Sequence, residues 1–359
     1  MIRIGVVGAG YWGAKHLRVL HELQGSELYM VCDQDQAKLD EIKHYYPNVM
    51  TTSDYQEMIK SDVDAIVIAT PVNSHFHLTK EALLAGKHVL VEKPLTSDVE
   101  SAQVLVNLSE EKGLTLMVGH TYQYHPTVDF LKSFLSSGEL GNLYYIDSAR
   151  LNLGVFRTDV DVLWDLAPHD ISIFLYLLDQ DPIWVSARAT AHVNPALAEV
   201  SYISLGFPNQ VLAHTHVSWL DPCKVRKLTM VGSKRMVVFD EVAPFDQLRI
   251  VDKGASLSDN GNGSSAPVVE YRYGEVRAPF IPDTEPLKLE CAHFLECVEQ
   301  RKKPRSDGQE ALRVISIIEA AHQSLANEGQ RVNLPQISRV HQPVTNGSNI
   351  LTPAPVSRS

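Results

Sequence analysis

Residues 2–13 read Ile-Arg-Ile-Gly-Val-Val-Gly-Ala-Gly-Tyr-Trp-Gly, and this stretch decides how the first part of the chain folds. The apolar residues 2–7 predict a strand, and leucines at helical spacing after the stretch predict a helix. Between them, Gly8, Gly10 and Gly13 form a Gly-x-Gly-x-x-Gly turn. A strand, such a turn and a helix in this order predict a dinucleotide site, because the helix N-terminus presents free N–H groups to a pyrophosphate.

Asp33 supports this interpretation, because it ends the second predicted strand about 20 residues after the glycine turn. A carboxylate there accepts hydrogen bonds from both ribose hydroxyls, whereas it repels a 2′-phosphate unless an arginine lies beside it. Residues 34–36 are Gln, Asp and Gln, so we expect NAD, with NADP left as an alternative through Lys38. A glycine-rich turn without a ligand is the structural alternative.

Strand and helix patterns alternate through the first third of the chain. Apolar runs at residues 28–32, 63–69, 89–91 and 114–118 predict further strands, with helical patterns between them. Alternation of this kind predicts parallel strands joined by right-handed crossovers. We therefore interpret residues 1–121 as a doubly wound α/β domain.

The pattern changes in residues 122–334, where alternating runs predict a large open, mostly antiparallel sheet with one covered face. The runs are residues 143–153, 184–193, 200–207, 210–217, 227–231 and 236–240. The candidate helices in this part are residues 127–136, 165–178 and 310–327. The polar, glycine-rich segment 254–267 predicts a flexible surface loop, and the segment 335–359 predicts a disordered tail.

Composition excludes several classes of protein. The net charge of −11 over 359 residues disfavours a nucleic-acid-binding protein. The four cysteines form no Cys-x-x-Cys pair, which indicates reduced thiols and a cytoplasmic protein. No apolar run approaches the roughly 20 residues that cross a bilayer, so we expect no membrane association.

Polar residues follow two of the buried strands, at the carboxyl edge where ligands of open α/β sheets bind. The residues after the run 63–69 are Thr70, Pro71, Val72 and Asn73. The residues after the run 89–91 are Glu92, Lys93 and Pro94. The first group is either a cofactor loop or a plain connection, and the second places a lysine at the same edge.

Asp165 and His169 are four residues apart and share one face if their segment is helical. The carboxylate would then orient the imidazole and hold its tautomer. A purely structural hydrogen bond is the alternative.

Two histidine pairs, His75-x-His77 and His214-x-His216, have the spacing of residues that share a face of a strand. Neither has a carboxylate or cysteine at a suitable third position, so we expect no metal site.

Three motifs together carry a resemblance to a known family. They are Gly8-x-Gly10-x-x-Gly13-x-x-His16, Glu92-Lys93-Pro94 and Asp165-x-x-x-His169. In this order they resemble the Gfo/Idh/MocA family of NAD(P)-dependent sugar and polyol dehydrogenases, over about residues 1–330. The resemblance implies a Rossmann domain followed by an α/β domain whose open sheet covers the nicotinamide face and commonly mediates dimers or tetramers.

The resemblance also implies roles for individual residues. Lys93 and His169 would serve proton transfer, with Asp165 lining the same site. The residues expected to contact the cofactor are Gly8, Gly10, Tyr11, Trp12, Gly13, Asp33, Thr70, Pro71, Asn73, His75, Glu92 and Lys93.

The chain departs from the family pattern just before Asp165, where residues 157–164 replace the usual glycine-rich stretch. Arg157, with Asn152 upstream, is a candidate for binding a substrate carboxylate or phosphate, and a solvated arginine is the alternative. His120 and Tyr124 are candidates for the substrate pocket, with structural roles as the alternative.

These residues lead us to expect an oxidoreductase that moves a hydride between NAD and a secondary alcohol or ketone of a sugar. The Gly-Tyr-Trp-Gly turn and residues 152–170 are most similar to members acting on nucleotide-linked sugars, such as the 3-dehydrogenases of UDP-N-acetylglucosamine or its uronate. Inositol or a free sugar is the alternative substrate. A non-catalytic NAD-binding regulator and a scaffolding protein are alternatives of other classes.

Overall fold

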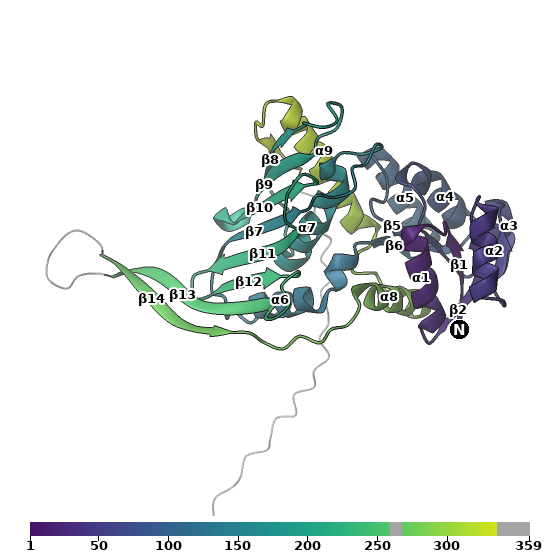
Figure 1. Cartoon of the computed structure of the whole chain (residues 1–359), viewed down its shortest axis with the longest axis horizontal. Coiled ribbons are helices and arrows are strands. Elements are labelled where there is room, and N and C mark those ends of the chain that lie inside the picture. Colours follow the sequence, from purple (N-terminus) through teal and green to yellow (C-terminus); the bar gives the residue numbers. More distant parts are fainter. Residues whose placement is uncertain (259–267, 336–359) are drawn as a thin grey trace, which may run out of the picture.

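The computed structural model describes residues 1–258 and 268–335, which form two sheets with their helices (Figure 1). The first sheet lies on the right of Figure 1, and the second sheet lies on the left and ends in a long hairpin. Residues 254–258, expected in a flexible loop, belong to the first strand of this hairpin, so that part of the prediction is wrong. The rest of the predicted loop, and the predicted tail beyond residue 335, lie outside the described residues.

The first sheet has six parallel strands in the order β3-β2-β1-β4-β5-β6, the order of dinucleotide-binding folds. Its strands are β1 (Ile2–Val7), β2 (Ser26–Cys32), β3 (Met50–Thr52), β4 (Ala65–Ile68), β5 (His88–Glu92) and β6 (Leu116–Gly119). Its helices are α1 (Tyr11–Glu22), α2 (Gln36–Tyr45), α3 (Tyr55–Lys60), α4 (Val72–Leu84) and α5 (Val99–Lys112). The predicted doubly wound parallel sheet is confirmed, and β3 and α3 are additions to it.

The second sheet has the order β14-β13-β12-β11-β7-β10-β9-β8-β15. Neighbouring strands are antiparallel except β7 and β10, so the mostly antiparallel sheet is confirmed. Its strands are β7 (Leu143–Leu151), β8 (Trp184–Thr190), β9 (Val200–Gly206), β10 (Leu212–Ser218), β11 (Val225–Gly232), β12 (Met236–Asp240), β13 (Leu248–Ser258), β14 (Val268–Arg277) and β15 (Val332–Asn333). The helices after β6 are the 3₁₀ helix η1 (Thr121–Tyr124), α6 (Pro126–Ser136), α7 (Val162–Leu178), the 3₁₀ helix η2 (Pro208–Gln210), α8 (Pro286–Gln300) and α9 (Gly308–Ala326).

Two late helices pack against the first sheet, and α9 also joins it to the second. In α9, Ala311 and Ile315 belong to the hydrophobic core of the first sheet, whereas Ile317 and Ile318 belong to that of the second. Phe294 of α8 packs into the other face of the first sheet. Helices from the end of the chain thus complete the N-terminal unit, and the division at residue 121 stays a prediction.

Two further features are the state of the cysteines and the hydrophobicity of the helices. All four cysteines are free. Among the residues that the structure describes, no helix is both long and apolar enough to span a bilayer.

Candidate active site

The glycine turn joins β1 to α1 in a form that side chains would prevent. Gly8 has a φ of +87°, and a Cβ on it would lie 2.7 Å from the carbonyl oxygen of Ala69. A Cβ on Gly13 would lie 1.9 Å from the Gly8 carbonyl oxygen, so α1 begins directly against the turn. The space around Gly10 is open to 4 Å, which leaves its backbone accessible to a phosphate. The turn therefore fits a dinucleotide pyrophosphate.

Asp33 lies beside this turn, at the end of β2. Its Oδ2 accepts a hydrogen bond from the backbone N–H of Ala9 at 2.6 Å, and its Oδ1 accepts one from Asp35 at 2.8 Å. The Nζ of Lys38 lies 3.9 Å from Oδ2. These contacts hold the carboxylate beside the glycine turn, and its hydrogen bonds to the ribose of NAD stay a prediction.

A cavity of about 130 Å³ lies next to the turn, and we call it the glycine-turn cavity. The predicted site residues that line it are Trp12, Thr70, Pro71, His75, Glu92, Lys93, Arg157 and Asp165. Tyr11 and Asn73 do not line it; Tyr11 is 73% exposed at the start of α1, and Asn73 lies in the first turn of α4.

Two of the three sequence motifs meet beneath this cavity. The Nε2 of His16, on α1, lies 2.9 Å from the Oε1 of Glu92, at the end of β5. Both residues are buried, so each supplies the hydrogen-bond partner that the other needs. This contact gives a physical reason for the histidine and the Glu92-Lys93-Pro94 tripeptide to occur together.

His75 supports the walls of the glycine-turn cavity. Its Nδ1 lies 2.8 Å from the carbonyl oxygen of Pro94, and its Nε2 lies 2.8 Å from that of Thr70. Burial lowers the pKa of His75, so the neutral ring donates to one of these carbonyls at a time. Because His75 and His77 lie on α4, the strand alternation considered for them is wrong.

Lys93 connects the first sheet to α7. Its Nζ donates to the backbone carbonyl of Asp165 at 2.6 Å and lies 3.6 Å from the Asp165 Oδ1. The other carboxylate oxygen accepts a hydrogen bond from the Nε1 of Trp219 at 3.0 Å. Helix α7 starts just before this point because the Asp161 side chain caps it, accepting from the N–H of Trp164 at 3.1 Å.

A second cavity, of about 210 Å³, lies on the other side of Asp165, and we call it the arginine cavity. Its charged or ring-bearing lining residues are Tyr122, Arg150, Asp165, His169, Trp219, Lys224 and Arg226. Asp165 and His169 thus share a face of α7, as their spacing predicted. The centroids of the Tyr122 and His169 rings are 4.8 Å apart. Asp165 lines both cavities and marks their junction.

Burial and neighbouring cations determine the protonation of this site. Burial, followed by Lys93 and Arg150, lowers the pKa of His169 well below its usual range. Burial also lowers the pKa of Lys93, against the opposite effect of Asp165. At neutral pH His169 is therefore an uncharged imidazole that is able to accept a proton.

Asp165 does not orient His169 in the way the sequence suggested. Its carboxylate contacts Trp219 and Lys93, while the Nδ1 of His169 is buried with no hydrogen-bond partner among the described residues. The indole of Trp219 arrives from the end of β10, a contact across 54 residues that helical spacing does not reveal.

His120 and Tyr124 do not line either cavity, so the structure does not support their prediction as substrate contacts. The hydroxyl of Tyr124 turns into the core, 3.0 Å from the Nδ1 of His293 and 3.2 Å from the Oγ of Ser306. Residues 121–124 form a 3₁₀ turn, whose successive side chains point in different directions, and Tyr122 is the one that reaches the arginine cavity. Both ring nitrogens of His120 are buried without a partner among the described residues, and burial, followed by Lys93, lowers its pKa to about 3.

The guanidinium of Arg157 is paired with acidic side chains, and its role in substrate binding stays a prediction. It makes two hydrogen bonds to Asp159, at 2.9 and 2.6 Å, and its Nη1 lies 3.8 Å from Asp165. Asn152 is exposed and lines the arginine cavity, and its contact with substrate stays a prediction.

Sequence reasoning missed Tyr122, Trp219 and the three cations of the arginine cavity. One signal was available, because Arg150 occupies an inward position of the alternating run 143–153, where an apolar residue is normal. Its guanidinium is buried against Asp170, with Nη2 donating to Oδ1 at 3.0 Å.

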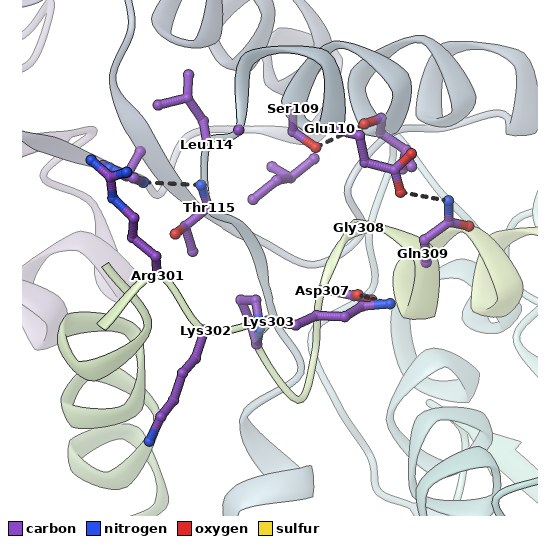
Figure 2. Close-up of a pocket in the computed structure, with 15 residues that line it drawn as sticks. Ser109, Glu110, Leu114, Thr115, Arg301, Lys302, Lys303, Asp307, Gly308 and Gln309 are labelled. Atoms are coloured by element: carbon purple, nitrogen blue, oxygen red, sulfur yellow. Dashed lines mark hydrogen bonds and ion pairs between the residues drawn. The ribbon is translucent and has the colours of Figure 1, made fainter. Parts of the chain in front are cut away.

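A third hollow, of about 310 Å³, lies at the opposite edge of the first sheet (Figure 2). Figure 2 shows Arg301, Lys302 and Lys303 on the connection between α8 and α9. Lys303 pairs with Asp307 at 2.8 Å. Since this hollow lies at the amino ends of β5 and β6, far along the strands from the glycine turn, we do not assign it to the active site.

His214 and His216 lie on β10, on the face of the second sheet that helices do not cover. The ring of His216 stacks on Tyr202 with centroids 4.1 Å apart. Within residues 1–258 and 268–335, no group of three or more His, Cys, Asp or Glu side chains is arranged to hold a metal ion.

Individual relatives of the chain include enzymes of known activity. It is 26% identical over 321 residues to the UDP-N-acetylglucosamine 3-dehydrogenase of Acidithiobacillus ferrooxidans, which covers 88% of this chain and 94% of that protein. It is 23% identical to an inositol 2-dehydrogenase of Rhizobium meliloti, over 92% of this chain and 98% of that protein.

Solved structures show the same fold. A structure of the Acidithiobacillus ferrooxidans enzyme superposes with a TM-score of 0.77 at 24% identity, covering 92% of this chain and 99% of that one. A levoglucosan dehydrogenase in complex with NADH and L-sorbose superposes with a TM-score of 0.79 at 18% identity, covering 94% and 99%.

Family profiles match both parts of the chain. The oxidoreductase family with an NAD-binding Rossmann fold matches residues 2–120, which contain the glycine turn, Asp33 and Lys93. The GFO/IDH/MocA C-terminal domain matches residues 128–238, which contain Asp165, His169 and most of the second sheet. The chain belongs to the GFO/IDH/MocA family of NAD-binding oxidoreductases.

Proposed function

We propose that this oxidoreductase uses NAD to oxidise a secondary hydroxyl of a sugar, or to reduce the corresponding ketone, where its two cavities meet. The observation that carries the proposal is the position of the Lys93 Nζ, 3.6 Å from the carboxylate of the one residue that lines both cavities. NAD, bound against the glycine turn and Asp33, would accept the hydride that leaves the carbinol carbon.

His169 is the proposed base for the hydroxyl proton. Its lowered pKa keeps the imidazole uncharged near neutral pH, and it lines the arginine cavity. The Lys93 ammonium donates a hydrogen bond to the same oxygen and stabilises its developing negative charge. Asp165 holds Lys93 in position through its carbonyl oxygen and its carboxylate.

For the substrate we favour a nucleotide-linked sugar, UDP-N-acetylglucosamine or its uronate, oxidised at position 3. The near full-length similarity to a UDP-N-acetylglucosamine 3-dehydrogenase supports this choice. The similarity to an inositol 2-dehydrogenase supports inositol, or a free sugar, as the second choice. A non-catalytic NAD-binding regulator would not need a buried lysine and a neutral histidine at the junction of two cavities.

A substrate panel tests this proposal. The purified protein is incubated with NAD and, separately, with UDP-sugars, free sugars and inositols, and NADH absorbance is followed. We expect turnover with a UDP-sugar. Turnover only of inositols or free sugars would show that the substrate is not a UDP-sugar. NAD binding without turnover of any compound would favour a non-catalytic NAD-binding regulator.

We also propose that the protein forms a homodimer or homotetramer in the cytoplasm through the uncovered face of the second sheet. Tyr145, Tyr202 and Leu212 are 43%, 47% and 49% exposed on neighbouring strands of this face. Light scattering after size-exclusion chromatography should show a smaller species for Tyr202→Glu than for the wild type. Equal masses for the two proteins would contradict the assignment of this face.

A further inference from the structure

The arginine cavity contains more positive charge than a neutral sugar requires. Its charged lining residues are three cations, Arg150, Lys224 and Arg226, and one carboxylate, Asp165. The whole chain has a net charge of −11, so this excess of cations is contrary to the charge of the protein as a whole.

Two of these cations face each other directly. Arg226 on β11 and Arg150 on β7 are register partners on adjacent antiparallel strands. The Tyr122 ring lies next to both, with its centroid 4.3 Å from the Arg150 guanidinium carbon and 5.6 Å from that of Arg226. Like charges directly opposite on adjacent strands destabilise a sheet unless other groups compensate them.

The protein's own carboxylates balance only part of this charge. The Nη2 of Arg150 donates to Asp170 at 3.0 Å, and the Nη1 of Arg226 donates to Glu241 at 2.8 Å. The Nη1 of Arg150 is buried and has no hydrogen-bond partner in the part of the chain that the structure describes. Lys224 is exposed and forms no ion pair with any described residue.

The arginine cavity also borders the cofactor side, because Asp165 lines both this cavity and the glycine-turn cavity. A substrate group held by Arg226 and Lys224 would therefore lie in a cavity that meets the cofactor side at Asp165.

We propose that the substrate carries an anionic group, a carboxylate or a phosphate, which binds Lys224 and Arg226 at the arginine cavity. This inference rests on the proposed function and narrows its substrate class. The Arg226 side chain is 32% exposed and open to a ligand, whereas that of Arg150 is 9% exposed and acts through its charge from behind Tyr122. A guanidinium and an ammonium together match the oxygens of either anion.

Matched substrates and variants test the proposal by turnover. UDP-N-acetylglucosamine and its uronate differ in a ring carboxylate, and UDP-N-acetylglucosamine and free N-acetylglucosamine differ in the nucleotide diphosphate. We expect Arg226→Gln to lower kcat/KM about tenfold or more for substrates that carry the bound group, relative to the paired substrate that lacks it, because one charge-assisted hydrogen bond is lost. If kcat/KM falls only for the uronate, the bound group is the carboxylate. If it falls equally for both UDP-sugars and stays unchanged for free N-acetylglucosamine, the bound group is the diphosphate.

Further variants separate binding from folding. Lys224→Gln should have a smaller effect in the same direction, and Arg226→Lys should restore part of the activity. Arg249→Gln makes the same change of charge at an exposed position of β13 and should match the wild type. The proposal would be overturned if Arg226→Gln lowered kcat/KM equally for neutral and anionic substrates, or lowered it for none of them.

A binding experiment separates this inference from the proposed function. Titration calorimetry measures the affinity of the NADH-loaded protein for glucuronate, for UDP and for glucose, each titrated separately. If no sugar is turned over but glucuronate or UDP binds about tenfold more weakly to Arg226→Gln than to the wild type, the anion site stands and the dehydrogenase proposal fails. If neither anion binds the wild type more tightly than glucose does, the anion site is wrong whatever the turnover.

Discussion

The glycine-turn cavity and the arginine cavity share Asp165 but differ in charge. The first is lined by two cations, Lys93 and Arg157, and two carboxylates, Glu92 and Asp165. The second is lined by three cations and only the shared carboxylate. In the first cavity each charge has a partner within the protein. In the second, Arg150 and Arg226 pair with Asp170 and Glu241, while Lys224 forms no ion pair with any described residue. The difference separates a site that holds a cofactor mostly through backbone and shape from one that selects a charged substrate.

The largest expected effect is at the junction of the two cavities. Lys93→Met should lower kcat about 100-fold or more, because it removes a donor to the reacting oxygen. NADH binding, followed by nicotinamide fluorescence, should stay within about twofold, since Asp33 and the glycine turn are untouched. The control is Lys43→Met, the same change at an exposed position of α2. A Lys93→Met enzyme with wild-type kcat would refute the assigned role.

The next effect is confined to the cofactor side. Asp33→Ala should raise KM for NAD about tenfold or more with kcat nearly unchanged, because hydrogen bonds to a charged acceptor are lost. Steady-state kinetics with NAD as the varied substrate measures both constants. Asp40→Ala, on the exposed side of α2, is the matched control. A fall in kcat at unchanged KM would show that Asp33 acts on chemistry rather than on binding.

His120 lines neither cavity, so its substitution should alter stability and leave KM for both substrates unchanged. Its pKa is about 3 in the folded state, below the ordinary value of 6.5, so the unfolded state binds one more proton between these pH values. The wild type should therefore lose about 1.4 kcal/mol of unfolding free energy per pH unit as the pH falls below 6.5, through this residue. Urea unfolding at several pH values should give His120→Asn a shallower slope by that amount. An unchanged slope would mean that the ring titrates normally.

The smallest effect concerns the arginine cavity alone. Arg226 lowers the pKa of His169 less than burial, Lys93, Arg150 and His120 do. In Arg226→Gln the pKa of His169 should rise, so the acid limb of the pH profile of kcat/KM should move to higher pH. The profile is best recorded with a neutral substrate, to separate this effect from anion binding. Movement of the limb to lower pH would contradict the charge assigned to this cavity.

Features that depend on neighbouring residues could be predicted from the sequence. The glycine turn is one, because a φ of +87° at Gly8 and the close approach at Gly13 allow no other residue. The common face of Asp165 and His169 is another, because helical spacing determines it. Helix α8 was missed although Leu287, Cys291, Phe294 and Leu295 recur at helical spacing. The long hairpin of β13 and β14 was also missed, and every residue of β14 is exposed, so it has no buried face to reveal it.

By itself, the sequence determined the parallel first sheet, the cofactor turn with Asp33, and the common face of Asp165 and His169, since these follow from local geometry and from where strands end. That Lys93 shares a site with Asp165 and His169 was implied only by the family resemblance. Only the tertiary structure decided that Trp219 binds Asp165, that Tyr122 rather than Tyr124 reaches the cavity, and that Arg150 lies opposite Arg226. These contacts join segments far apart in the chain. Their side-chain directions depend on strand register and helix packing, which no local pattern encodes.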